Sequence, residues 1–410
     1  MTTRTRARKD RSIFTQAVHA GERGPRPDFT PVSAPIYHSV GYLYDELEDL
    51  DAVFGGQRPG FVYTRYGSPT VLAFEQAMAI LERAGDAVAF ASGMAALHAV
   101  LLGAGARAGR VVVAAADLYG ATYALLERLF PALGTKVCFV DIADHNQVAR
   151  TLAEEGPAAL LCEAVSNPLM KVADVPQLAG MAHAAGALLL VDSTFASPYL
   201  LRPLEQGADY AVHSATKYLG GHGDVMAGVV ACSEEKGRDL RERQKLLGAN
   251  LGPQEAWLAM RGLKTLPLRM RQHCANAQVV AEWLTGQPAV AAVHYPGLAN
   301  HPQHALAARL FEGRGFGGML SFELRGAGRA EVFRFMKALE LALPATTLGD
   351  VYSLALYPAH SSHRLLSPEA RSALGIGEGL VRLSVGIEEA QDIIDDLEQA
   401  LGRAFENHGR

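Results

Sequence analysis

One lysine stands among residues that could do chemistry together. Lysine is scarce in this chain, with eight lysines against thirty arginines, and Lys217 lies in the segment HSATKYLGGHG, between small hydroxyl residues and a glycine run. A lysine that follows a buried strand loses solvation, which lowers the pKa of its amine. The neutral amine can then attack a carbonyl and form a Schiff base. A single lysine does not specify a reaction, so this hypothesis depends on its partners.

Two further groups of residues could serve such a lysine. Asp192 ends the apolar run ALLLVD, at the carboxyl end of a predicted strand, where open α/β sheets bind ligands. An aspartate there can hold the proton of a pyridinium ring, which makes the ring an electron sink. Ser92, Gly93 and Met94 follow another apolar run and open a predicted helix. Their hydroxyl and free N–H groups meet the positive end of the helix dipole, where a phosphate binds.

The residues beside the lysine complete this arrangement. Ser214 and Thr216 can donate hydrogen bonds to the same phosphate. A glycine-rich turn, a strand-end aspartate and a helix cap are each common separately, but here their roles converge. Together they predict a site for pyridoxal 5′-phosphate.

A sheet must position these residues. Short apolar runs rich in β-branched residues alternate with helical patterns in the middle of the chain, as in βαβ units. Most of the runs lack polar alternation, which indicates a parallel sheet covered on both faces. The predicted strands cover residues 87–91, 110–115, 136–141, 158–162, 187–192, 210–213 and 228–232.

Helix signals frame these strands, and the pattern changes near residue 235. Ser68 and Pro69 are placed as the N-cap and first residue of a helix to about residue 83. Asp174 is expected to cap a helix over 175–185, with Gly186 just past its end. Beyond 235 we expect a long helical stretch through 240–285, strands near 318–324 and 381–386, and a helix over 388–404. The fold class is therefore α/β, with a large, mostly parallel domain followed by a smaller α+β domain.

Composition excludes several classes of protein. The 410 residues are 49% hydrophobic and 20% charged, which is typical of a globular chain and excludes a disordered or fibrous one. The net charge of −5 offers no footprint for nucleic acid or an anionic membrane. The four cysteines form no CxxC pair, and the basic residues near the start are followed by no apolar leader segment. We expect a cytoplasmic protein with a solvated basic tail, no membrane span and no metal site.

From about Val18 to Leu401 the chain resembles the Cys/Met-metabolism family of pyridoxal phosphate enzymes. This family contains cystathionine γ-synthases, cystathionine and methionine lyases, and homoserine-ester sulfhydrylases. The resemblance implies the PLP-dependent transferase fold of type I, with helices on both faces of a large mixed sheet. The matching segments are VHAGE (18–22), PVSAPIY (31–37), YTRYGSPT (63–70), ASGMAA (91–96), DLYG (117–120), EAVSNP (163–168), VDSTFASPYL (191–200), HSATKYLGGHGDVMAG (213–228) and LVRLSVGIEE (380–389).

The resemblance also implies roles for single residues around the cofactor. Lys217 would carry the cofactor as a Schiff base and move protons, and Asp192 would pair with the pyridine nitrogen. Tyr119 would stack on the ring and assist the leaving group, while Asn167 would hydrogen-bond the phenolic oxygen. The phosphate would be held by Ser92, by the backbone N–H groups of Gly93 and Met94, and by Ser214 and Thr216.

Substrate and subunit contacts follow from the same resemblance. Arg382, with Thr347 and Tyr119, would bind an amino-acid substrate, and the arginine would form a bidentate hydrogen bond with its carboxylate. Tyr63 and Arg65 would reach the phosphate of a neighbouring subunit, which implies at least a homodimer and, in this family, usually a tetramer. We therefore divide the chain into an arm that contacts the neighbour (1–62), a cofactor-binding α/β domain (63–255) and a C-terminal α+β domain (256–410).

The chain departs from the family pattern where substrates are distinguished. Thr346 stands where cystathionine-specific members usually have a glutamate, and Tyr352 where they often have another. Ala121 replaces the cysteine typical of methionine γ-lyases. Without those carboxylates, an apolar or small leaving group is favoured over a charged one. The leading hypothesis is γ-elimination to 2-oxobutanoate, ammonia and a thiol, and the alternatives are γ-replacement on an O-acyl-homoserine and β-elimination.

Other interpretations of the sequence remain weaker. The run 313–318 contains GxGxxG but precedes a predicted strand, and Ser214 to Lys217 match SxxK without its companion motifs. His294, His301 and His304 form no HExxH. An aminotransferase matches the flanking motifs less well. A catalytically silent scaffold that merely retains the fold is the alternative from a different functional class.

Overall fold

The computed structural model describes residues 11–20, 31–362, 364 and 367–405. Most of the basic tail (1–10) and the last two residues of VHAGE lie outside this part. Within the described ranges, no helix has both the length and the apolarity to cross a lipid bilayer.

The larger of two sheets contains every strand predicted before residue 235. Its order is β1-β7-β6-β5-β4-β2-β3, with β7 antiparallel to β1 and β6 and the remaining pairs parallel. The predicted mixed, mostly parallel sheet is therefore confirmed, and each strand end lies within one residue of its expected position. The strands are β1 (Asp86–Phe90), β2 (Val111–Ala115), β3 (Lys136–Val140), β4 (Ala159–Glu163), β5 (Leu188–Asp192), β6 (Tyr210–Ser214) and β7 (Gly228–Cys232).

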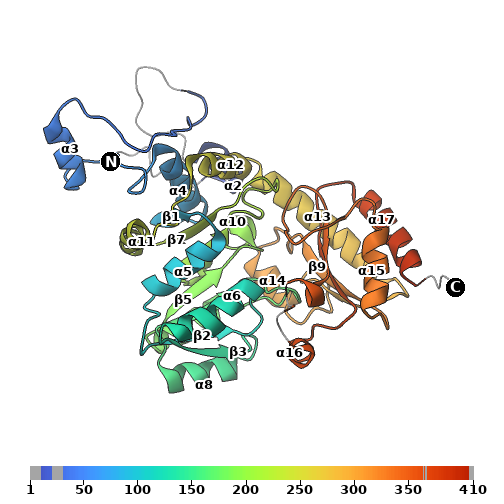
Figure 1. Cartoon of the computed structure of the whole chain (residues 1–410). Helices are drawn as coiled ribbons and strands as arrows, with labels where there is room; N and C mark the ends of the chain where they lie inside the picture. The colour runs from blue at the N-terminus through green and yellow to red at the C-terminus, as the bar shows by residue number, and fades with distance from the viewer. Residues whose placement is uncertain (1–10, 21–30, 363, 365–366, 406–410) are drawn as a thin grey trace.

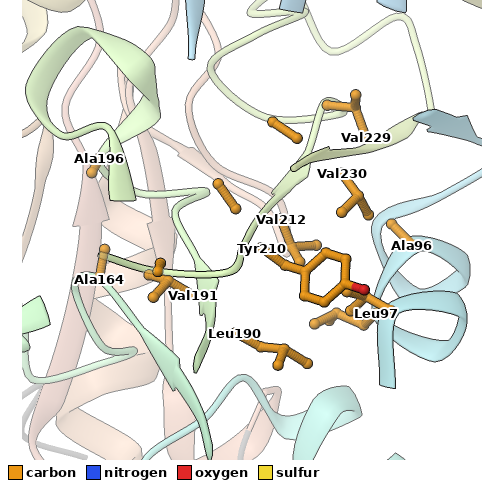
Figure 2. Close-up of a cluster of buried hydrophobic side chains, with 14 of the residues drawn as sticks. Ala96, Leu97, Ala164, Leu190, Val191, Ala196, Tyr210, Val212, Val229 and Val230 are labelled. Carbon is orange, nitrogen blue, oxygen red and sulfur yellow. The ribbon is translucent and has the colours of Figure 1, made fainter. Parts of the chain in front are cut away.

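Helices cover both faces of this sheet (Figure 1). Because side chains alternate along a strand, residues an odd number of positions apart, such as Tyr210 and His213 of β6, point to opposite faces of the sheet. Tyr210 packs beside Leu97 of α5 (Figure 2), whereas His213 hydrogen-bonds Glu82, the C-cap of α4, at 2.6 Å. The elements are α4 (Pro69–Leu81), α5 (Gly93–Gly103), α6 (Gly120–Ala124), a π-helical turn η1 (Leu125–Leu129), α7 (Phe130–Ala132), α8 (His145–Glu155), α9 (Val175–Ala184), α10 (Ser197–Leu200), η2 (Pro203–Gln206), α11 (Glu234–Leu247) and α12 (Pro253–Leu263).

The predicted helix ends are correct with one exception. Asp174 caps α9 by accepting from the N–H of Gln177, and Gly186 follows in the left-handed region with φ of +71°. Ser68 does occupy the N-cap of α4, but its side chain makes no capping hydrogen bond. Its side chain instead lines a cavity of about 260 Å³.

A second, five-stranded sheet lies beside the first, with order β10-β11-β12-β9-β8. The single helical stretch expected over 240–285 is wrong in detail, because it contains three helices separated at Gly248–Gly252 and at Lys264–Thr265. The strands are β8 (Val290–His294), β9 (Met319–Leu324), β10 (Leu343–Pro344), β11 (Leu354–Leu356) and β12 (Leu380–Ser384). The helices are α13 (Leu266–Thr285), α14 (His304–Leu310), α15 (Arg329–Ala338), η3 (Pro358–His360), α16 (Pro368–Ala373) and α17 (Ala390–Ala404).

The N-terminal segment is packed less completely than either sheet. The short helix α2 (Ile13–His19) contacts α4 and α13. In contrast, α3 (Leu47–Phe54) buries no residue and stands away from the body (Figure 1). Leu43 nearby is 101% exposed. Apolar side chains left this open over a long segment are typical of a surface that another chain covers.

Candidate active site

A cavity of about 220 Å³ lies between the carboxyl ends of the large-sheet strands and loops of the small sheet. The sequence-predicted residues that line it come from segments far apart in the chain. They are Ser92, Gly93, Met94, Tyr119, Asn167, Asp192, Ser214, Thr216, Lys217 and Arg382. The structure thus brings ten of the thirteen predicted site residues into one cavity.

Lys217 follows β6 and reaches across to the small-sheet side. Its Nζ donates to Oγ1 of Thr347 at 2.9 Å, so the eleventh predicted residue touches the lysine. Burial, together with the positive charge of Arg382, lowers the pKa of the Lys217 amine to about 8, while the charge of Asp350 opposes the change. An amine with this pKa is partly neutral near physiological pH, and its neutral fraction can act as a nucleophile.

The start of α5 forms a cup at one end of the cavity. The Oγ of Ser92 accepts from the N–H of Ala95, which leaves the N–H groups of Gly93 and Met94 free of helical partners. A Cβ at Gly93 would lie 2.8 Å from the Cβ of Ser214, so only glycine lets α5 begin this close to β6. The cup therefore presents backbone donors and hydroxyls at a helix N-terminus, as a phosphate requires.

Asp192 lies on the floor of the cavity at the end of β5. Its Oδ1 accepts from both the N–H and the Oγ1 of Thr194, at 3.0 and 2.5 Å. In the described part of the chain, Oδ2 accepts no such bond and stays available for a ring nitrogen. Burial raises the pKa of Asp192, while the bonds from Thr194 and the charge of His213 act in the opposite direction.

Glu163 is a floor residue that the sequence reasoning missed. It ends β4 in register with Asp192, and its Oε1 accepts from the N–H of Tyr119 at 2.6 Å. Burial, reinforced by the charge of Asp192, raises the pKa of Glu163 well above its usual range. The signal was available, because ALLCE places an acid at the end of a buried run just as ALLLVD does.

Arg382 projects from β12 and joins the two sheets. Its guanidinium donates to Oδ1 of Asn167 at 3.1 Å and to the carbonyl of Thr347 at 3.2 Å, while its buried Nε has no partner among the described residues. Burial lowers the pKa of Arg382 to about 10. Because Asn167 accepts through its oxygen, its amide nitrogen remains a donor for a phenolic oxygen.

The remaining predicted residues lie elsewhere. Tyr63 and Arg65 do not line the cavity. Arg65 packs over the rings of Tyr63 and Tyr66 and donates to the carbonyl of Lys245. Sequence reasoning assigned no role to several residues of the cavity wall, which are Leu97, Val165, Thr194, Phe195, Met226, Leu348 and Ser362.

The donor set of the cavity fits pyridoxal phosphate. A buried, partly neutral lysine, a carboxylate with one unused oxygen and a helix-end cup lie in one enclosure. These are the groups that the aldehyde, the ring nitrogen and the phosphate of that cofactor require.

Comparisons with known proteins agree with this fit. Residues 14–402 match the family described as Cys/Met metabolism PLP-dependent enzyme. The chain is 43% identical to L-methionine gamma-lyase of Pseudomonas putida over 392 residues, which cover 94% of this chain and 96% of that protein. It is 41% identical to cystathionine gamma-lyase of Bacillus subtilis (strain 168), with 94% and 98% covered.

A solved structure supports the same assignment. The crystal structure of cystathionine gamma synthase from Xanthomonas oryzae pv. oryzae, in complex with aminoacrylate and cysteine, matches with a TM-score of 0.89 at 38% identity. The match covers 96% of this chain and 98% of that one. The predicted fold class and family are thus confirmed. The chain belongs to the Cys/Met metabolism family of enzymes, and its cofactor is pyridoxal phosphate.

Proposed function

We propose that the chain catalyses γ-elimination on a sulfur-containing amino acid. The bond between Cγ and sulfur breaks, and one water is consumed as the product releases ammonia. Methionine would give 2-oxobutanoate, ammonia and methanethiol. The observation that carries this proposal is that Lys217, Arg382 and Tyr119 line one cavity, so that a proton carrier, a carboxylate fork and a phenol can act on one bound amino acid.

Each residue has a task that its position allows. Bound pyridoxal phosphate supplies an electron sink for the electron pairs left at Cα and Cβ. Arg382 binds the substrate carboxylate, and Asp192 holds the ring proton through Oδ2. Lys217 removes the proton at Cα and moves the second proton at Cβ, and the phenol of Tyr119 assists the departing sulfur.

The wall of the cavity favours an uncharged leaving group. Leu97, Val165, Phe195 and Met226 contribute apolar surface, and Thr346 offers a hydroxyl where a carboxylate would be needed to pair a distal ammonium group. The charged residues of the lining are Glu163, Asp192, Lys217 and Arg382. Each of these already has a partner or a task, so a second charged group on the substrate would find no counter-charge.

A product assay separates this reaction from its alternatives. The purified enzyme is mixed with methionine, cystathionine, homocysteine and an O-acyl-homoserine, each with and without added cysteine or sulfide. Release of 2-oxobutanoate from methionine in the absence of added cysteine or sulfide supports γ-elimination. Product only from the homoserine ester, diverted to a thioether or thiol by the nucleophile, would instead establish γ-replacement. Pyruvate from cystathionine would establish β-elimination.

We further propose a cytoplasmic homodimer, paired into a tetramer, in which Tyr63 and Arg65 complete the partner's phosphate site. The support is that both residues lie outside their own chain's cavity, next to the exposed apolar segment that includes Leu43 and Leu47. Light scattering measures the assembly.

Mixed subunits test the shared site. Arg65→Ala and Lys217→Ala chains are each expected to be nearly inactive. Each mixed dimer then contains one intact site, so random mixing should restore about a quarter of the original activity. Mixtures that stay inactive would show that each chain builds its site alone.

A further inference from the structure

A buried carboxylate beside the lysine is used by no step described so far. Asp350 is fully buried, and within the described part of the chain neither of its oxygens makes a hydrogen bond of normal geometry, although the backbone N–H of Gly223 faces the carboxylate. Gly223 is its near neighbour, since a Cβ at that glycine would lie 3.2 Å from Oδ2 of Asp350. A buried carboxylate without bonded partners is costly, so a role in local electrostatics is expected.

The segment that carries Asp350 is fixed against the lysine segment at three points. Thr347 accepts from Nζ of Lys217, and the N–H of Val351 donates to the carbonyl of Gly221 at 3.0 Å. Between them, Gly349 has φ of +79°, and a Cβ there would lie 2.8 Å from the backbone nitrogen of Tyr218. The segment that carries the carboxylate is therefore held against the backbone of the lysine segment on both sides of Asp350.

The charges around the two groups single out this pair. Besides burial, two charges act on the pKa of Lys217: Arg382 lowers it by disfavouring the ammonium form, and Asp350 raises it by favouring that form. Burial raises the pKa of the Asp350 carboxyl, while the charge of Lys217, the backbone N–H of Gly223 and the charge of His222 act in the opposite direction. The negative charge of Asp224 adds to the rise.

Three other titratable groups lie within electrostatic range of Asp350, namely Arg269, Tyr218 and Tyr352. Arg269 already donates to the carbonyls of Tyr218, Leu219 and Gly262. Among the described residues, the amine of Lys217 in contrast bonds the hydroxyl of Thr347 alone.

We propose that Asp350 is the counter-charge for the free amine of Lys217, stabilising its ammonium form whenever the cofactor has passed to the substrate. This rests on the proposed function, in which Lys217 must accept the Cα proton. Asp350 acts through Lys217 and is therefore a positioning residue. With the counter-charge present, the lysine is a stronger base and retains the proton it has removed.

The test measures the lysine rather than turnover. The full-length enzyme is freed of cofactor, and the rate at which pyridoxal phosphate restores the visible absorbance band is followed against pH. Only the neutral amine reacts, so the midpoint of the rate profile reports the pKa of Lys217, expected at about 8. Removing a carboxylate that favours the ammonium form lowers this pKa, so Asp350→Asn should move the midpoint down by about one pH unit.

Two further variants control the measurement. Asp224→Asn removes a neighbouring but exposed carboxylate and should shift the midpoint by no more than about 0.3 unit, because solvent screens its charge. Asp350→Ser removes the same charge but leaves a smaller side chain than Asp350→Asn does. If one of the two variants folds poorly, the other still reports the pKa of Lys217. The titration of the cofactor itself is common to all variants and cancels in the comparison.

The outcomes are distinct. A downward shift in both Asp350 variants, without one in Asp224→Asn, supports the proposal. An unshifted midpoint overturns it, even if the variants melt earlier, and would make Asp350 a structural partner of Arg269. If the unsubstituted enzyme never develops the band, the proposed function itself fails and this inference fails with it.

Discussion

The two walls of the cavity are built differently. On the large-sheet side, Glu163, Asp192 and Ser214 end three strands, and the register of those strands fixes their spacing. On the small-sheet side, Arg382 projects from the middle of a strand, and the residues from Thr346 to Leu348 belong to a loop. The groups proposed for bond-breaking, Lys217 and Tyr119, lie in loops that follow strands of the large sheet, while the small-sheet side holds those proposed for substrate recognition.

Among the described residues, both regions bury acids whose pKa burial raises, Asp350 among them, but the histidines whose pKa burial lowers lie on the small-sheet side. In the large-sheet region, burial raises the pKa values of Glu75, Glu163 and Asp192. In the small-sheet region, burial lowers those of His273, His294 and His301. The regions should therefore respond differently to pH as well as to substitution.

The largest effect is expected on the large-sheet wall. Lys217→Ala removes the Schiff-base amine, so the visible cofactor band should disappear and turnover should fall by at least about 1,000-fold. Absorbance and 2-oxobutanoate release measure the two effects. Lys337→Ala, on the exposed face of α15, is the matched control and should change neither. Retention of the band in the Lys217 variant would refute the assignment.

Acid should unfold the small-sheet region first. His273 is fully buried, donates from Nδ1 to the carbonyl of Val385 at 2.6 Å, and has its pKa lowered to about 4. Its unfolded pKa is about 6.5, so the unfolded state binds the extra proton between these values. The stability is complete above pH 6.5 and falls by about 3 kcal/mol toward pH 4.

The two tryptophans allow this order to be measured. Trp257 packs against the large-sheet core and Trp283 against the small-sheet core. In Trp257→Phe, the emission of Trp283 should change at a higher pH than the emission of Trp257 does in Trp283→Phe. Coincident transitions would show that the two regions unfold together.

On the small-sheet wall, Arg382→Ala should affect binding more than chemistry. Loss of a charge-assisted fork to the substrate carboxylate should raise KM about 100-fold and leave the cofactor band in place. Arg382→Lys should recover only part of the loss, because an ammonium group cannot form the two parallel bonds. An unchanged KM, or loss of the band, would contradict the division between the walls.

The smallest effect is expected where the walls meet. Thr347→Val removes the hydroxyl that accepts from Lys217, which should lower kcat by about fivefold with little change in KM. Thr346→Val is its control, because Thr346 lines the cavity without bonding the lysine. Equal effects on kcat from both variants would assign the loss to cavity shape instead of the hydrogen bond.

The sequence predicted the large sheet well because its signals are local. Buried strands such as β4 and β5 are continuous apolar runs, and Asp192, which is proposed for catalysis, ends β5. Glycine and proline interrupt the stretch over 240–285, and Gly248, with φ of +79°, ends α11 there. The division of this stretch into several helices could therefore also have been predicted from the sequence. The short strands β10 and β11 carry too few residues to show any period.

Contacts between distant segments could not be predicted in the same way. Arg382 bonds Asn167 across 215 residues, and no pattern in either segment specifies that pairing. The same holds for Thr347 and Lys217, which meet only when the small sheet packs on the large one. Likewise, the Ser68-Pro69 pair does not reveal that the Ser68 side chain makes no capping hydrogen bond.

The buried guanidinium of Arg382 has a practical consequence for handling the enzyme. Its positive charge is buried, and among the described residues it bonds an amide oxygen and a backbone carbonyl, with one nitrogen unused. Any small carboxylate can relieve that charge, so acetate or formate in a buffer should compete with substrate, while amines that lack a carboxyl group should be ignored. The choice of buffer anion will therefore change the apparent KM measured for this protein.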